Sequence, residues 1–279
     1  MTQIELTPNE RLFSRLRWQA SDSLVVARRS LAHVRQIPEK LIDVTLQPLM
    51  FVLLFGFVFG GVIAVPGGGD YREYLIGGIL VQTIAFGLMT PATALATDLT
   101  EGIVDRFRTL PMSPSSFLLG HMIAALAAMA LAIAVLSVSG LIIGWEIHAS
   151  LISAVAGYGV LVTFAFTMLW VGALIGVLVR SPDAVMGIGF LIVFPMTFLA
   201  ATFVPIDGLP DGLRQIAEYN PVSSLAVATR TLFGNPTALP ADVPWTLAHP
   251  VASSLGWCAA LLAVAMPLTV RRFRAKTTD

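Results

Sequence analysis

The sequence predicts an all-α integral membrane protein with six transmembrane helices, and three observations point to this fold class. Hydrophobic residues make up 56% of the 279 residues and charged residues only 12%, whereas about a quarter of a soluble domain is charged. Six apolar segments are long enough to cross about 30 Å of hydrocarbon, which takes roughly 20 residues each. The Lys and Arg residues are divided unequally between the connections that join these segments.

Residues 1–43 are expected to form a cytoplasmic N-terminal arm with an amphipathic interfacial helix. Between residues 9 and 37, apolar residues such as Leu24 and Leu31 recur at helical spacing beside basic residues, and Pro38 ends the pattern. A basic amphipathic helix of this kind lies on a membrane surface. A soluble arm is the alternative. This region has no uninterrupted apolar core, so a cleavable signal peptide is not expected. The candidate interfacial residues are Arg28, Arg29 and Arg35.

The membrane domain is expected over residues 44–270, followed by a cytoplasmic tail at 271–279. Gly-x-x-x-Gly pairs inside the apolar segments predict close helix packing within the bundle. These pairs are Gly56/Gly60, Gly140/Gly144 and Gly172/Gly176. The six spans are expected near 44–65, 74–97, 117–144, 151–179, 184–204 and 250–270.

The distribution of basic residues predicts the orientation of the chain. Fourteen of the 17 Lys and Arg residues fall in the N-terminal arm, the second and fourth connections and the C-terminal tail. The other three are Arg72, Arg214 and Arg230. Because positive residues stay inside, both termini and the charged connection between the second and third spans are expected in the cytoplasm.

A charged island at residues 97–119 separates the second and third spans and must lie outside the bilayer. Asp98 and Thr100 are expected to cap a short helix here, and Leu110-Pro111 ends it. One interpretation is a solvated loop helix, and the other is a lever that a soluble partner moves. The charged residues of the island are Asp98, Glu101, Asp105, Arg106 and Arg108.

The long connection at residues 205–249 predicts two short helices. Residues 210–219 and 222–233 have helical spacing and are separated by Asn220-Pro221. Neither helix is long enough to span, so we expect an extracellular re-entrant helical hairpin that dips into the outer leaflet. An ordinary extracellular loop is the alternative.

The fifth span carries a stripe of large side chains spaced four residues apart: Met186, Phe190, Phe194 and Phe198, with Pro195 able to kink the helix. Such a stripe is either packed core or a surface that contacts a ligand.

The sequence lacks the residue patterns that proton-coupled transport, ATP hydrolysis and several kinds of hydrolase require. No Asp, Glu, Lys, Arg or His lies between the interfacial ends of the six spans, which disfavours a proton-coupled carrier. No phosphate-binding loop, Gly-x-Ser-x-Gly elbow or His-Glu-x-x-His pair is present, so the chain is not expected to be an enzyme or to bind a cofactor or metal. The lone Cys258 and a net charge of zero indicate neither a disulfide nor a nucleic-acid partner. Energy for transport would come from another chain.

Three blocks of sequence resemble the ABC-2 permeases, especially the daunorubicin-resistance type of bacterial drug or lipid exporter. The first is PEKLIDVTLQP at 38–48, which leads into Met50-Phe51 and FGG at 59–61. The second is EGIVDRFRTLPM at 101–112, and the third is Asn220-Pro221-Val222. The blocks occur in the family's order and extend over nearly the whole chain.

The resemblance implies a permease that dimerises to twelve spans and docks two copies of a separate ATP-binding-cassette subunit, which binds the ATP and magnesium. A homodimer is expected, and a heterodimer with a second permease stays open. The island would be the coupling helix, next to the N-terminal interfacial helix at the ATPase surface. Its expected coupling residues are Asp98, Glu101, Gly102, Asp105, Arg106, Phe107, Arg108, Leu110 and Pro111.

The resemblance also implies a translocation path at the dimer interface, lined by the second and fifth spans and closed by the re-entrant helices. An apolar path suits a hydrophobic or amphipathic cargo, because a buried polar cargo would leave its groups unpaired. A secondary carrier and a non-transporting membrane scaffold are the alternatives. The expected lining residues are Phe86, Met89, Phe190, Phe194 and Phe198, and the expected outer-gate residues are Asn220 and Pro221.

Overall fold

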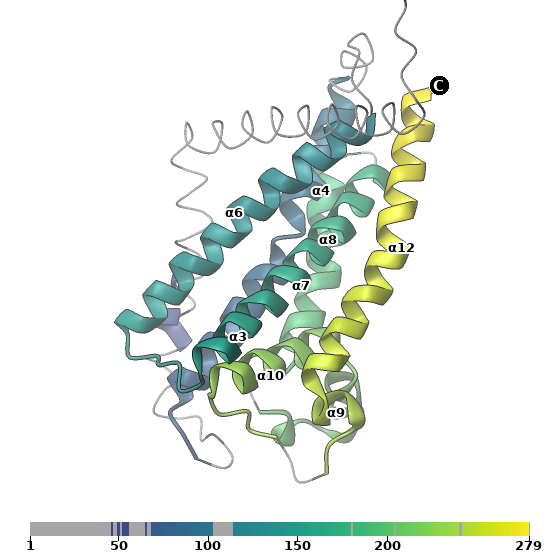
Figure 1. Ribbon diagram of the computed structural model, residues 1–279. Coiled ribbons are helices and arrows are strands. Elements are labelled where there is room, and N and C mark those ends of the chain that lie inside the picture. The colour runs from purple at the N-terminus through teal and green to yellow at the C-terminus, as the bar shows by residue number, and fades with distance from the viewer. Residues whose placement is uncertain are drawn as a thin grey trace, which may run out of the picture.

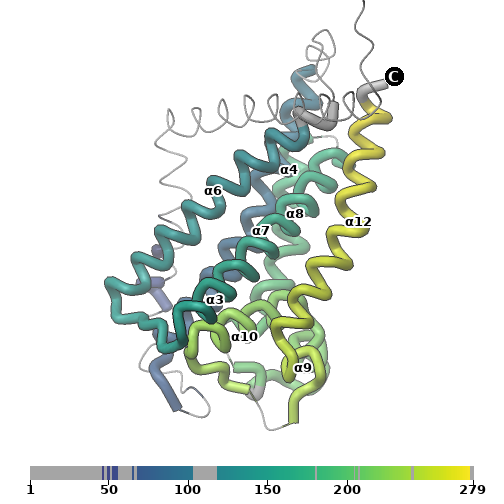
Figure 2. Tube along the Cα trace, viewed as in Figure 1, coloured from purple at the N-terminus to yellow at the C-terminus, as the bar shows by residue number. Residues whose placement is uncertain are grey.

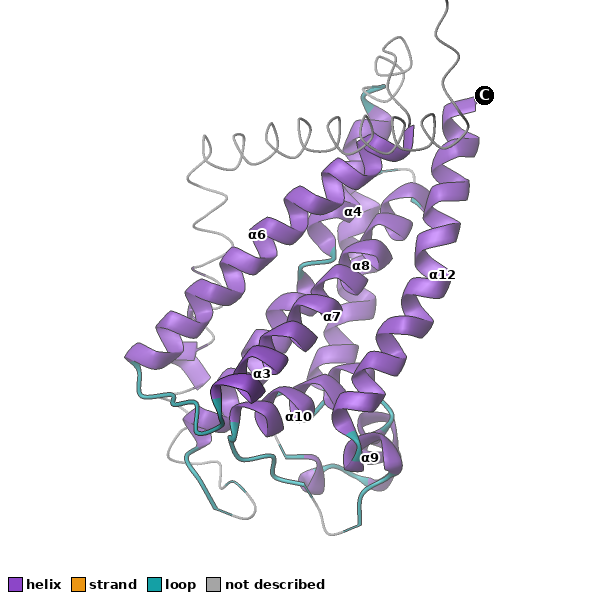
Figure 3. Cartoon of the chain, viewed as in Figure 1, coloured by secondary structure: helices purple, strands orange, loops and turns teal. Residues whose placement is uncertain are grey.

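The computed structural model of the chain describes residues 46, 49–50, 52–55, 65, 68–102, 114–179, 181–203, 205–239 and 242–278. Every regular element among these residues is a helix (Figure 3). The N-terminal arm, with Arg28, Arg29 and Arg35, lies outside the described residues.

Four stretches within the described part of the chain are long and apolar enough to cross a membrane. They correspond to the second, third, fourth and sixth predicted spans. The fifth predicted span corresponds to α8 (Pro182–Phe198), a shorter apolar helix of 17 residues. The first, near 44–65, lies mostly outside the described residues, so the count of six stays a prediction. The four stretches are Tyr71–Thr100, Leu118–Ile142, Leu151–Leu178 and Pro250–Lys276.

The second predicted span is a broken helix made of α3 (Tyr71–Phe86) and α4 (Met89–Thr100). The Asp70 side chain caps α3 by accepting a 2.9 Å hydrogen bond from the backbone N–H of Arg72. Pro91 lies in the first turn of α4 and has no N–H to donate to the Gly87 carbonyl four residues earlier. The helix is therefore interrupted just before the proline.

Three long helices form most of the bundle: α6 (Pro114–Ile142), α7 (Leu151–Leu178) and α12 (Pro250–Thr278). Each has 28 or 29 residues and is about 40 Å long, enough to cross the hydrocarbon with a turn or two to spare. Helix α12 runs through most of the predicted tail. Phe273, near its end, is buried in an apolar cluster with residues of α4, α6 and α7, which gives this last part of the helix a packing partner.

Helix α7 packs closely against α4 through two glycines. A Cβ atom added to Gly172 would collide with the Leu88 carbonyl oxygen, and one added to Gly176 would collide with the Ala92 carbonyl oxygen. The backbones of the two helices approach more closely here than any larger residue allows. This confirms the predicted packing role of the Gly172/Gly176 pair.

The connection from α8 to α12 folds into a 3-10 turn (Ile206–Gly208) and three helices: α9 (Asp211–Glu218), α10 (Pro221–Phe233) and α11 (Trp245–Ala248). Residues 222–230 of α10 are all buried, and α10 packs on α3, α7 and α12. This part of the connection is therefore not an exposed loop. Its depth relative to the bilayer stays a prediction.

Different helices lie at the two ends of the bundle (Figures 1 and 2). Helices α9 and α10 lie at one end, beside the start of α12. The end of α4 and the C-terminal end of α12 lie at the other. Glu101 and the basic end of α12, Arg271 to Lys276, are thus placed at the same end of the bundle, as the alternation of the predicted spans requires.

Candidate functional site

Six phenylalanine rings form a continuous series from the middle of the bundle toward the α10 end, which we term the aromatic ladder. Phe86 meets Phe190 edge-on with ring centroids 6.0 Å apart, and Phe190 stacks on Phe194 at 5.1 Å. Phe194 stacks on Phe198 at 4.2 Å. Phe198 then meets Phe203 at 5.3 Å, and Phe203 stacks on Phe55 at 4.7 Å. Offset and edge-on contacts of this kind are the favourable ones for aromatic rings.

The spacing of residues in α8 explains why the ladder is partly exposed. Val185, Gly189, Val193 and Thr197 form a buried stripe of four-residue spacing, which packs on α4. The phenylalanines each follow a residue of this stripe and are therefore turned about 100° away from it. Phe190, Phe194 and Phe198 are 38–52% exposed, so these phenylalanines are not part of the core within the single chain.

Phe86 and Met89 are half-buried on either side of the break between α3 and α4. The absence of a side chain at Gly189 leaves room for Met89, whose Cε atom would lie 3.3 Å from an added Cβ. Four of the five predicted lining residues, Phe86, Phe190, Phe194 and Phe198, therefore form one apolar surface, and Met89 lies beside α8 at Gly189. This surface can accommodate apolar or aromatic groups of a ligand.

Arg230, on α10, is fully buried and is held by backbone carbonyls rather than by a carboxylate in the described part of the chain. Its Nε donates to the Tyr74 carbonyl oxygen at 2.8 Å, and its terminal nitrogens donate to the carbonyls of Ala201 at 2.6 Å and Thr202 at 2.8 Å. The guanidinium also lies 3.5 Å from the centroid of the Tyr74 ring, a cation–π contact.

Two tyrosines bind the same segment as Arg230. The Tyr71 hydroxyl donates to the Phe203 carbonyl at 2.9 Å, and the Tyr74 hydroxyl donates to the Ala201 carbonyl at 3.2 Å. We call residues 201–203 together with the three side chains that bind their carbonyls, Tyr71, Tyr74 and Arg230, the carbonyl clasp. The clasp joins α3 and α10 to the segment that carries Phe203, the ladder residue beyond α8.

Gly77 and Gly78 make room for the clasp on α3. A Cβ added to Gly77 would lie 2.9 Å from Cγ of Arg230, and one added to Gly78 would collide with the Thr202 carbonyl oxygen. The glycine pair therefore lets both the guanidinium and the 201–203 backbone approach α3.

Asn220 and Pro221, the predicted outer-gate residues, connect α10 to the end of α8. The Asn220 side-chain oxygen caps α10 by accepting from the Val222 N–H at 2.9 Å, and Pro221 occupies the first helical position. The Asn220 amide nitrogen donates to the Met196 carbonyl at 2.7 Å. That carbonyl is in the last turn of α8, where helical partners run out. Asn220 thus links the start of α10 to the C-terminal end of α8, next to Phe198 of the ladder.

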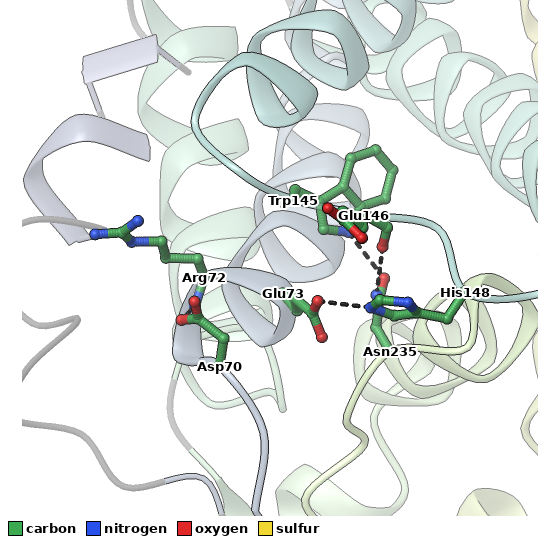
Figure 4. Close-up of polar contacts among 7 residues, drawn as sticks. All are labelled: Asp70, Arg72, Glu73, Trp145, Glu146, His148 and Asn235. Carbon is green, nitrogen blue, oxygen red and sulfur yellow. Dashed lines mark hydrogen bonds and ion pairs between the residues drawn. The ribbon is translucent and has the colours of Figure 1, made fainter.

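The connection between α6 and α7 is held to α3 and to the end of α10 (Figure 4). The Glu73 carboxylate accepts a 2.7 Å bond from His148, and this contact raises the pKa of His148 above its usual value, with a smaller contribution from Glu146. Trp145 donates its indole N–H to the Asn235 side chain at 2.8 Å, and Asn235 donates to the Glu146 carbonyl at 2.8 Å. These contacts fix the position of α10 from its C-terminal side.

A model of the ABC-2 type transporter family matches residues 23–233, which include α3 to α10 and most of the contacts described above. The chain belongs to the ABC-2 type transporter family.

Two relatives of this ABC-2 chain are resistance permeases. The daunorubicin resistance ABC transporter permease protein of Streptomyces coeruleorubidus is 30% identical over 89% of this chain and 84% of its own length. The doxorubicin resistance ABC transporter permease protein of Mycobacterium tuberculosis is 22% identical over 72% of this chain and 69% of its own length. With its long apolar helices, the ABC-2 chain is a multi-pass membrane protein.

The predicted coupling residues of the ABC-2 chain are described only at their start. Asp98 and Thr100 belong to the last turns of α4, so the prediction that they cap a new helix is wrong. The Thr100 hydroxyl donates back to the Ala96 carbonyl at 3.0 Å, whereas an N-cap side chain would accept from a backbone N–H that follows it. Glu101 ends α4, and Gly102 follows with a φ of +65°. Asp105, Arg106, Phe107, Arg108, Leu110 and Pro111 lie outside the described residues.

Arg230 is the residue that sequence reasoning missed. A search for ionisable residues restricted to the spans passes over it, because it lies in the connection between the fifth and sixth. One signal was present: Arg230 is the single charge in the otherwise uncharged helical run 221–233. Because arginine is not deprotonated in proteins, this buried charge does not supply the proton relay of a secondary carrier.

Proposed function

We propose that this chain is the membrane permease subunit of an ATP-binding-cassette exporter that moves hydrophobic or amphipathic compounds, a drug or a lipid, out across the bacterial plasma membrane. The observation that carries the proposal is the likeness, over 89% of the chain, to a permease whose name records daunorubicin resistance. Membership of the ABC-2 family implies a partner ATPase subunit. We propose two copies of it, bound to a dimer of this chain.

The aromatic ladder is the surface that we assign to the cargo. Three of its rings, Phe190, Phe194 and Phe198, are exposed in the single chain along the second half of α8. Phe86 of the second span contacts Phe190, and Met89 lies beside α8. Planar aromatic compounds with polar substituents would stack on such rings, and stacking contributes about 0.5–1.5 kcal/mol per ring pair beyond burial. Asn220 and Pro221, at the end of α8, would act as the outer gate.

The test is transport of a fluorescent anthracycline by the permease reconstituted with its cassette ATPase, comparing Phe194→Ala with Ile192→Ala. Both side chains are exposed on α8, but Ile192 is turned well away from the ladder. We expect Phe194→Ala to raise the cargo concentration needed for half-maximal transport by about fivefold, on the order of 1 kcal/mol. Equal effects of the two variants would refute the ladder as the path. If none of the tested hydrophobic compounds were transported, the exporter assignment would be refuted.

A further inference from the structure

Helix α9 packs against the rest of the protein, but the larger apolar side chains of this helix face away from the protein and are exposed. On its inner side, Arg214 donates to the Glu218 carboxylate at 2.8 Å, and Ala217 is fully buried. The Thr246 hydroxyl of α11 donates to the Glu218 carbonyl at 2.7 Å, which binds α9 to α11. The charged pair of this amphipathic helix thus lies on the side that faces the protein, where Arg214 also donates to the Asp242 carbonyl at 3.4 Å.

The exposed side of α9 divides into two halves along the helix axis. At 100° per residue, Asp211 and Gln215 fall on one half, and Leu213, Ile216 and Tyr219 fall on the other. The last three are 38–59% exposed, and all lie within about 120° of arc. A helix with such a division is suited to a boundary between water and an apolar phase.

Trp245 lies just before the start of α12, one of the helices long and apolar enough to cross a membrane. It is 62% exposed, and its ring stacks on His249 at 5.1 Å, immediately before α12 begins at Pro250. Helix α11 contacts α12, and α9 is bonded to α11, so both short helices lie at the level where the long apolar helix α12 begins (Figure 1). Trp and Tyr are enriched at this level of membrane proteins because their rings are apolar and carry one polar group.

We propose that Leu213, Ile216 and Tyr219 of α9 and Trp245 of α11 form an interfacial surface that rests in the headgroup region of the lipid leaflet at this end of the bundle. Its occupant is phospholipid: the apolar half of α9 lies among the upper acyl chains while Asp211 and Gln215 stay in water. The contact anchors α9 and α11. Helix α10, which follows α9 in the chain, carries the buried Arg230. It requires only a bilayer and does not depend on the identity of any cargo.

The experiment compares Ile216→Cys with Gln215→Cys, each in a Cys258→Ala background and labelled with a small environment-sensitive fluorophore. The two positions are adjacent and both exposed, but they lie on different halves of α9. The protein is reconstituted in phosphatidylcholine vesicles that contain lipid spin-labelled either near the headgroup or deep in the chain. Iodide, present on both sides of the membrane, reports on exposure to water.

We expect the label at Ile216 to be quenched at least twofold more by the shallow spin label than the label at Gln215, and the deep spin label to quench it less. Iodide should show the reverse order between the two positions. Equal quenching at both positions would overturn the proposal. So would an Ile216 label that neither lipid nor iodide reaches, because a second copy of the chain would then cover this face. Trp245→Cys, labelled in the same way, should behave like Ile216→Cys, and iodide quenching there would also count against lipid contact.

Discussion

Arg230 is the one charged side chain in the described part of the chain that is buried. Removing a charged group from water costs several kcal/mol even after the protein relaxes. The three carbonyls and the Tyr74 ring offset that cost, since a hydrogen bond to a charged group contributes about 1.5–3 kcal/mol. The fork of the guanidinium is what allows one side chain to bind two neighbouring carbonyls and a third on α3.

Replacing Arg230 should therefore destabilise the protein. We expect Arg230→Leu to cost about 2–4 kcal/mol, because a buried carbonyl left unpaired costs about 1–3 kcal/mol. Arg230→Lys keeps the charge but not the fork, so its loss should be smaller. Thermal unfolding in detergent would measure both. The control is Arg272→Leu, an exposed change expected to stay within about 0.5 kcal/mol. An Arg230→Leu protein that melts with the wild type would contradict the clasp.

The His148–Glu73 contact predicts a pH dependence. The contact raises the pKa of His148 in the folded protein, so its stabilising effect is fully present below the unfolded value of about 6.5. It is lost as the pH rises through the folded pKa. The difference in melting temperature between wild type and His148→Gln should thus be larger at pH 6 than at pH 8.5. A difference that does not change with pH would show that the charged form of His148 is not stabilised by Glu73.

At the scale of elements, the contact between α7 and α4 depends on residues without side chains. Gly172→Ala would force the two backbones apart, because the new methyl group would meet the Leu88 carbonyl. We expect a loss of about 1–3 kcal/mol, as in other overpacked sites. The matched control is Gly159→Ala on the same helix, where nothing lies within 4 Å of the added Cβ. That change should be neutral or should stabilise α7 by up to about 1 kcal/mol. Melting temperatures that fall equally in both variants would contradict the packing assignment.

The element expected to couple the permease to ATP hydrolysis begins after α4. Glu101 is exposed at the end of that helix, and reversing Glu101 and Asp105 to Lys should weaken docking of the ATPase subunit if its receiving surface is basic. Insertion and dimerisation should be normal, since the first of these residues ends the span and the second follows it. Pull-down of the ATPase subunit and ATP-driven transport are the measurements. Asp211→Lys, at the other end of the bundle, is the control. A variant with an unchanged complex and unchanged transport would return the island to a solvated loop.

At the scale of the whole molecule, the distribution of charge predicts which end of the bundle faces the cytoplasm. Glu101 and Lys276 are exposed at one end, and Gln215 is exposed at the other. In a Cys258→Ala background, cysteines at Glu101 and Lys276 should be shielded from an impermeant thiol reagent in intact cells, whereas one at Gln215 should react. The same reagent should label all three in opened cells. Labelling of Glu101→Cys from outside would invert the predicted topology.

The fold class, most of the span positions and the family could be predicted from sequence because their signals are local. A run of about 20 apolar residues is itself the property that places a helix in a membrane, and each backbone group of such a helix is satisfied within the segment. The two short helices after α8 were predicted in the same way, from spacing around Asn220-Pro221. The four-residue spacing of the phenylalanines likewise placed them on one face of α8.

Tertiary structure alone decided how these helices are joined. Arg230 bonds to Tyr74 across 156 positions, and Trp145 bonds to Asn235 across 90, distances along the chain at which no periodicity carries information. The local signals at Asp98 and Thr100 were misleading, because the residue types that cap helices also occur inside them, where a hydroxyl can bond back to the helix's own backbone, as that of Thr100 does in α4. Whether the phenylalanine stripe is core or surface depended on which neighbours cover α8. The sequence by itself thus determined which four of the described segments are long and apolar enough to cross a membrane, since hydrophobicity is a property of each segment. The buried guanidinium and the exposed ladder were decided by packing between segments, which depends on residues that only the folded chain brings together.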